Sequence, residues 1–110
     1  MANTFKIKTK ANVSTIATVY TVPSSTTAIV IGCMIGNVQS SSITVTVHIE
    51  SDTSDTETNA NVELVTNAPI PAGSSLELLS GNKIVLQTTD LLRLTASAGC
   101  DIALSILEIT

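Results

Sequence analysis

Apolar and polar residues alternate with a period of two through much of the chain. In the clearest segment, 43–50, four branched aliphatic side chains alternate with polar ones: Ile43, Val45, Val47 and Ile49 against Thr44, Thr46, His48 and Glu50. Successive side chains of a β-strand point to opposite faces, so the segment predicts a strand packed on one side. Ile102, Leu104 and Ile106 repeat the pattern, and the apolar residues after them indicate that the second face of that strand is covered too.

Five further segments complete the strand pattern. Weaker alternation predicts strands around 5–8, 16–22 and 92–96. Ala28–Ile35 and Lys83–Gln87 are almost continuously apolar, which is typical of central strands. No stretch keeps a 3.6-residue period long enough to predict a helix.

Clusters of turn-forming residues separate these segments. They lie at 23–25, 36–42, 69–73, 81–82 and 98–99. The resulting spacing predicts eight or nine strands in one domain over 1–110. We therefore expect an all-β fold, an antiparallel β-sandwich with either jelly-roll or immunoglobulin-like connections.

The first ten residues allow two interpretations. Segment 1–10 is either an extended arm that adds a strand to a neighbouring subunit or the ordinary first strand of the same sandwich. In a strand, Lys6, Lys8 and Lys10 share one face, which meets either solvent or a partner. These lysines and Phe5 are our candidate interface residues.

The composition is poor in charge. Charged residues make up 13% of the chain and aromatic residues 2%, whereas Ser and Thr supply 30 of the 110 residues. The 14 ionic residues would be spread at one per roughly 400 Å² of the folded surface expected for this mass. A surface of mixed charges normally prevents self-association, and this chain has few charges. We therefore expect other subunits to cover part of its surface, in a homo-oligomer with a trimer favoured. The alternative is a monomer kept soluble by its hydroxyl groups and a net charge of −4.

Charge and hydropathy also restrict the partners. With five Lys and Arg against nine Asp and Glu, the chain does not fit a nucleic-acid binder. The longest apolar stretch, Ala28–Ile35, is too short to cross a bilayer, and the N-terminus lacks the apolar core of a secretory signal. We expect synthesis in the cytoplasm and no membrane partner.

Residues for catalysis are scarce. A hydrolytic triad needs a base, and the only histidine, His48, lies on the polar face of a regular strand. We expect it to be solvated or at an interface, and we expect no enzymatic activity and no cofactor. Cys33 lies in an apolar stretch and Cys100 in a predicted turn, and without a secretory context both are expected to be reduced.

The segment between Glu50 and Glu63 is the most acidic. Asp52, Asp55 and Glu57 are a weak Ca²⁺ candidate, because hard cations take clustered oxygens. The spacing does not match an EF-hand, so a solvated surface loop is the favoured interpretation and no metal site is assigned. A receptor-facing tip is the other alternative.

Four sequence motifs resemble those of small virion proteins of tailed bacteriophages, particularly phages of cyanobacteria and other aquatic bacteria. They are VYTVPSSTTAIVI at 19–31, PIPAGSS at 69–75, DLLRLTASA at 90–98 and SILEI at 105–109. They follow the family's order over most of the chain. The resemblance implies a structural β-sandwich with no catalytic residues to carry over.

The resemblance and the composition together favour a capsid decoration or cement protein. Such a subunit, made in the host cytoplasm and carried on the virion, would dock on the major capsid protein through repeated interfaces. A neck, tail or fibre-associated virion protein is the first alternative. A host-receptor-binding module, using the loop at 52–61, is the second.

Overall fold

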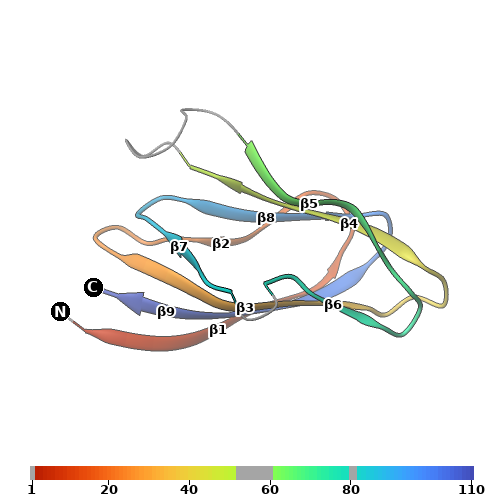
Figure 1. Cartoon of the computed structure of the whole chain (residues 1–110), viewed down its shortest axis with the longest axis horizontal. Helices are drawn as coiled ribbons and strands as arrows, with labels where there is room; N and C mark the ends of the chain where they lie inside the picture. Colours follow the sequence, from red (N-terminus) through yellow and green to blue (C-terminus); the bar gives the residue numbers. More distant parts are fainter. Residues whose placement is uncertain (1, 52–60, 80–81) are drawn as a thin grey trace.

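The fold is a sandwich of two antiparallel sheets, seen in a computed structural model that describes residues 2–51, 61–79 and 82–110 (Figure 1). The described residues form nine strands and no helix, as the alternation predicted. The strands are β1 Asn3–Val13, β2 Ala17–Thr21, β3 Thr27–Asn37, β4 Ile43–Glu50, β5 Asn61–Ile70, β6 Ser75–Glu77, β7 Ile84–Leu86, β8 Leu91–Ala96 and β9 Cys100–Ile109. In this part of the chain, no helix is long and apolar enough to span a membrane.

The strand order distinguishes the two connection types left open by the sequence. Sheet A has the order β1-β9-β3-β6, with β7 pairing with a different part of β3, and sheet B has the order β2-β8-β4-β5. Most connections cross from one sheet to the other, so strands distant in sequence become neighbours (Figure 1). A five-stranded and a four-stranded layer connected in this way form a jelly roll.

The inner faces of the two sheets supply the core. Ile43, Val45 and Val47 are buried, as the alternation predicted, and Ile49 is half-buried at the end of the strand. Ile102, Leu104 and Ile106 of β9 are buried opposite them. Burying an aliphatic side chain of this size stabilises the folded state by about 1.5–3 kcal/mol relative to leaving it in water.

Two predictions about individual strands are wrong. Lys83–Gln87 was expected to contain a central strand, but β7 has three residues and lies at the edge of sheet A, where Val85 is 60% exposed. Cys100 was expected in a turn, but it begins β9 and is buried. No strand was predicted at β5, and the pairing of β5 with β4 is interrupted by register shifts.

The N-terminal segment lies along the last strand of the same chain. β1 pairs antiparallel with β9 from Asn3↔Ile109 to Lys10↔Ile102 and forms the edge of sheet A. The two ends of the chain are therefore adjacent, as Figure 1 shows. Ala2 N–H donates to the Thr110 carbonyl at 3.0 Å, and Thr110 N–H donates to the Ala2 carbonyl at 2.9 Å.

Candidate interaction surface

The outer face of sheet A, directed away from sheet B, is apolar. Residues paired across antiparallel strands point to the same side, and Phe5, Leu107, Ile29 and Val85 form one continuous row across β1, β9, β3 and β7. Phe5 is 74% exposed, and Leu107 and Ile29 are half-buried. These large side chains are available to a partner and are not part of the core of this chain.

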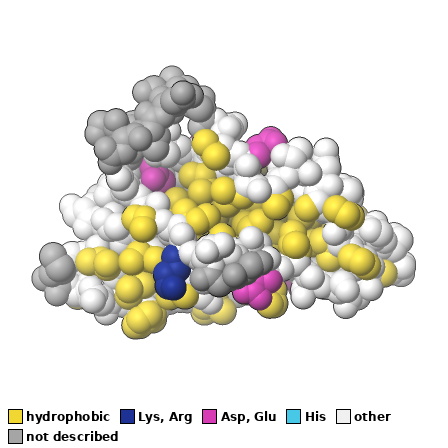
Figure 2. Space-filling view, in the orientation of Figure 1, with side chains coloured by type: hydrophobic (Ala, Val, Ile, Leu, Met, Phe, Trp, Pro, Cys, Tyr) yellow, Lys and Arg dark blue, Asp and Glu magenta, His cyan; other side chains and the backbone are white. Residues whose placement is uncertain are grey.

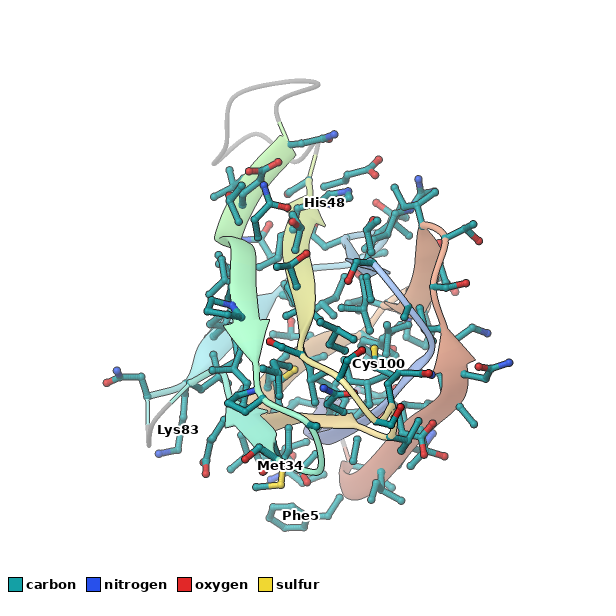
Figure 3. All side chains as sticks on the ribbon, turned by 90° about the vertical axis from the view of Figure 1, so that its right-hand side faces the viewer. Phe5, Met34, His48, Lys83 and Cys100 are labelled. Carbon is teal, nitrogen blue, oxygen red and sulfur yellow. The ribbon has the colours of Figure 1, made fainter. Side chains whose placement is uncertain are left out.

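Five such rows cover the outer face. Counting along β9 from its C-terminal end, the rows contain Asn3, Ile109 and Thr27; Phe5, Leu107, Ile29 and Val85; Ile7, Ser105 and Gly32; Thr9, Ala103, Met34 and Glu77; and Asp101, Gly36 and Ser75. Figure 3 shows Phe5 and Met34 projecting from the same side of the molecule. Four of the seven exposed large hydrophobic residues among the described residues lie here: Phe5, Ile7, Met34 and Val85. Large hydrophobic exposure is thus concentrated on one sheet face.

The end of this face with the fourth and fifth rows is hollowed. A cavity of about 370 Å³ is lined by Thr9, Met34, Gly36, Asp101 and Ala103, among others. Gly36 and Ala103 carry little or no side chain, whereas Met34 is large and flexible, so the floor is low and one wall can adjust. The hollow has room for an apolar side chain from a partner.

Charge on the outer face is confined to this same end. Glu77 and Asp101 are the ionic residues of the five rows, and both belong to the fourth and fifth. The first row, at the other end, has only uncharged residues: Asn3, Ile109 and Thr27. Figure 2 views the described residues side-on to the two sheets, in the orientation of Figure 1, and shows few charged side chains among many hydrophobic ones.

The candidate interface residues of β1 lie on its two opposite sides. Phe5 is on the outer face, whereas Lys6, Lys8 and Lys10 pair with Ile106, Leu104 and Ile102 and point to the inner side of the sheet. The three lysines share one side, as expected, and remain exposed because β1 is at the edge. One flat partner surface cannot contact both Phe5 and the lysines.

A buried ionic cluster fixes β1 against sheet B. Lys6 Nζ lies 2.8 Å from Glu108 Oε1, and the Tyr20 hydroxyl donates to Glu108 Oε2 at 2.5 Å. Glu108 is 5% exposed and Tyr20 is 4% exposed. The carboxylate thus has two partners from β1 and β2, as a buried charge requires.

The pKa values in this cluster shift in the directions that its hydrogen bonds dictate. The hydrogen bond from Lys6, then that from Tyr20, lowers the pKa of Glu108 despite its burial. Burial, and then the Glu108 carboxylate, raises the pKa of Tyr20. Glu108 is therefore ionised and Tyr20 is neutral at pH 7. A buried carboxylate that is paired in this way stabilises the folded chain.

The sequence contains a signal for this cluster, although Glu108 was not among the candidate site residues. Glu108 continues the inward phase of Ile102, Leu104 and Ile106, so alternation alone places a carboxylate in the core. A buried carboxylate needs a cation or hydroxyl partner, and Lys6 and Tyr20 lie at the inward phase of their own strands.

His48 is on the outer side of sheet B. Of the two expectations, that it is solvated or that it lies at an interface, the first is wrong for the single chain. It is 5% exposed, and its Nε2 lies 3.0 Å from Glu50 Oε2. Arg93 Nη1 lies 3.1 Å from the same oxygen, and Arg93 Nε donates to Thr18 Oγ1 at 3.0 Å. Glu50 therefore joins His48 to Arg93. Figure 3 shows His48 far from Phe5 and Met34.

Neither cysteine is placed for reactivity. Cys33 and Cys100 are both free and buried, and Cys100 Sγ donates to the Val13 carbonyl at 3.4 Å. Burial raises the pKa of Cys33 to about 11 and also raises that of Cys100, so both remain thiols at pH 7.

The metal candidate of the sequence cannot be placed. Asp52, Asp55 and Glu57 lie outside the described residues. Within residues 2–51, 61–79 and 82–110, no group of three or more His, Cys, Asp or Glu side chains is arranged to hold a metal ion.

No family model matches this chain, and no curated protein sequence matches it. Solved structures do share its fold. One is from work on Bacillus endospore appendages, described as disulfide-linked pili, with a TM-score of 0.50 and 14% identity over 96% of this chain and 85% of the other. The likeness at this identity concerns the fold.

Two further structures come from infectious bursal disease virus. A mutant VP2 protein in T=1 particles has a TM-score of 0.56 and 9% identity over 97% of this chain and 32% of the other. A chain of the T13 viral particle has a TM-score of 0.53 and 9% identity over 96% of this chain and 34% of the other. This chain therefore covers about one third of the length of these viral chains, and at this identity the likeness concerns the fold. The class that the strand order and these likenesses show is an all-β jelly-roll sandwich.

Proposed function

We propose that this protein is a structural subunit of a tailed-phage virion, specifically a capsid decoration or cement protein that stabilises the head through protein contacts. The observation that carries the proposal is the combination of a fully packed core with an apolar outer face on sheet A. A fold that has already buried its core does not need Phe5 and Ile7 in solvent, and large exposed apolar patches mark interaction sites.

Three features support an assembly role. The jelly-roll fold is shared with chains from viral particles and a pilus. The outer face of sheet A has few charges, which is typical of the centre of an interface. The residues quoted above resemble tailed-phage virion proteins in order along the chain. Catalysis is not part of the proposal, because His48 is engaged with Glu50 and Arg93.

Buried thiols favour particle assembly by non-covalent contacts over cross-linking by disulfides. The pilus structure is described as disulfide-linked. In this chain Cys33 and Cys100 are both buried inside one subunit, where a second copy cannot reach them. Contacts between copies therefore depend on surface complementarity.

Quantitative mass spectrometry of purified virions from the phage that encodes this chain tests the proposal. Decoration predicts a copy number comparable with that of the major capsid protein, in the hundreds. A copy number near a dozen would replace decoration by the neck, tail or fibre alternative. Virions that lack the chain would overturn the proposal.

The second alternative, a host-receptor-binding module, needs a separate test. It places recognition in the loop at 52–61, and residues 52–60 of this loop lie outside the described part of the chain. Binding of the purified chain to host cells, with and without this loop, should be negligible and unchanged under the proposal. Strong binding that disappears with the loop would favour the receptor function.

A further inference from the structure

We infer that the outer face of sheet A binds a second copy of this chain, in a two-fold dimer whose stacked sheets run antiparallel to each other. The inference deepens the proposed function and rests on it in one respect, that the chain acts within an assembly. It identifies the partner of the apolar face and the orientation in which that partner docks.

The size of the face fits a second copy. Four strands about 4.8 Å apart and five rows about 6.7 Å apart give a face of about 20 by 27 Å. Two such faces in contact remove roughly 1,100 Å² from solvent, which exceeds the minimum of about 1,000 Å² for a specific protein interface. The row from Phe5 to Val85 lies well inside this area, where a dimer would bury it most fully.

The positions of the acidic residues favour one of the two ways in which the two sheets could stack, with their strands parallel or antiparallel. A two-fold axis parallel to the strands would set the fourth and fifth rows of each copy against the same rows of the other, so that Glu77 and Asp101 of both copies gather at one end of the interface. An axis across the strands, passing through the third row, instead sets Asp101 over the first row and Glu77 over the second row, and neither of these rows carries a charge. Like charges in an interface disfavour the first arrangement, so the strands of the two copies run antiparallel.

The hollow provides shape complementarity in the same arrangement. With the axis through the third row, the second row of one copy lies over the fourth row of the other. Phe5 then lies over Thr9 and Ala103 of the second copy, two residues that line the hollow of about 370 Å³. An aromatic side chain inserted into a pocket is the common form of an interface hot spot. By symmetry the contact forms twice.

The lysines of β1 disfavour the competing edge-to-edge contact. β1 is an eleven-residue edge strand whose outer backbone edge could pair with β1 of another copy. Antiparallel pairing would bring Lys6, Lys8 and Lys10 beside the same lysines of the second copy, because all three point to one side. Lysines on an edge strand are a recognised protection against such pairing. Association through the face remains available.

Sedimentation equilibrium of the whole chain, with a charge introduced on either sheet, tests the face. Ile7→Asp places a carboxylate next to the proposed axis, where Ile7 is 64% exposed in the single chain. The dissociation constant should rise at least about 30-fold, because each copy buries an unpaired charge against its own counterpart. The control Val62→Asp changes a residue that is 58% exposed on β5 of sheet B, and it should leave the dimer unchanged. A wild-type chain that is monomeric at about 1 mM, or an oligomer indifferent to Ile7→Asp, would overturn the inference.

Cross-linking tests the orientation. In the antiparallel stack Ile7 lies near the axis, so Ile7→Cys should give a covalent dimer with a short bis-maleimide reagent. Val62→Cys should give none, and the wild type is a clean background because Cys33 and Cys100 are buried. A dimer that Ile7→Cys does not link would overturn the antiparallel arrangement.

Failure of the inference and failure of the proposed function are distinguishable in these experiments. The dimer is measured on the purified chain, whereas decoration is measured in virions. Virions without the chain, together with a dimer that depends on Ile7, would remove the decoration function and leave the dimer. A chain that is monomeric when purified but abundant in virions would overturn the dimer and leave the decoration function. The outer face of sheet A would then contact another virion protein.

Discussion

The two sheets of the sandwich present outer faces of different chemistry. The outer side of sheet B carries hydroxyl groups and an ionic group in which Glu50 joins His48 to Arg93. The outer side of sheet A carries exposed apolar residues, with Phe5, Ile7 and Val85 among them. The inner faces of both sheets contribute residues to the buried core.

This difference separates the requirements of folding from those of assembly. A sandwich needs two apolar inner faces, and both sheets of this chain provide them. It does not need an apolar outer face, and sheet B shows that a polar one is compatible with the fold. We propose that the apolar residues on the outer side of sheet A contact other molecules, so substitutions on the two sides of this sheet should have different effects.

The largest effect is expected from a charge on the inner face. Val47→Asp buries an unpaired carboxylate at a position with 0% exposure and should destabilise the domain by more than about 4 kcal/mol. Ile7→Asp, on the outer face of sheet A, should keep the thermal midpoint of the monomer within a few degrees. Far-ultraviolet circular dichroism during heating measures both and should show sheet with almost no helix before unfolding. Similar losses in the two variants would contradict the separation.

A smaller effect is expected from truncating neighbours on β9. Leu104 is 0% exposed, so Leu104→Ala should leave a cavity and lower the free energy of unfolding by about 3 kcal/mol. Leu107 is half-buried on the outer face, and Leu107→Ala should lower it by about 1 kcal/mol. Urea denaturation at a concentration where the chain is monomeric compares the two. Equal losses would show that Leu107 belongs to the core.

Removing the buried charge should cost about 2 kcal/mol. Glu108→Gln breaks the contact with Lys6, and the exposed Glu77→Gln is the control that should change little. Because the folded-state pKa of Glu108 is lowered, its contribution is fully present above its usual value of 4.5 and is lost as the pH falls through the lowered pKa. Urea denaturation between pH 7 and pH 3 should show a shallower acid loss in Glu108→Gln than in the wild type. Parallel pH curves would contradict the role of the ion pair.

The smallest effect on stability is expected from lysine on either outer face. Ser105→Lys in sheet A and Thr95→Lys in sheet B should each change the free energy of unfolding by less than about 0.5 kcal/mol. They should differ in association, because Ser105 is in the third row, near the proposed axis, and Thr95 is on the other sheet. Sedimentation should show a weaker dimer for Ser105→Lys only. The comparison fails if Thr95→Lys weakens the dimer equally.

Alternation predicted the strands that have one buried side. The segment from Ile43 and the segment from Ile102 could be assigned because their inward and outward residues differ in polarity. The same rule misplaced β7, because an apolar run normally indicates burial on both sides, whereas Val85 is apolar and exposed. An outer face that is apolar for assembly has the same pattern as a central strand.

The remaining features depended on contacts between distant segments. Burial of His48 requires Arg93 and Glu50 to come together across β4 and β8, which no local pattern specifies. β5 contains Asn67 with a φ of 49° and also Pro69, so its sequence resembles a loop more than a strand. The apolar outer face of sheet A could not be predicted from the sequence, because it depends on the strand pairing that places Phe5 beside Leu107.

The mutual hydrogen bonds between Ala2 and Thr110 have a practical consequence for engineering. A linker of a few residues could join these two positions with little distortion, and new ends could be opened in the polar turn around Ser40 and Ser41, at the end of β3. Such a circular permutant would keep all nine strands but carry its tags at the other end of the long axis. A fluorescent label could then be placed at either end of the sandwich without touching the outer side of β1 and β9.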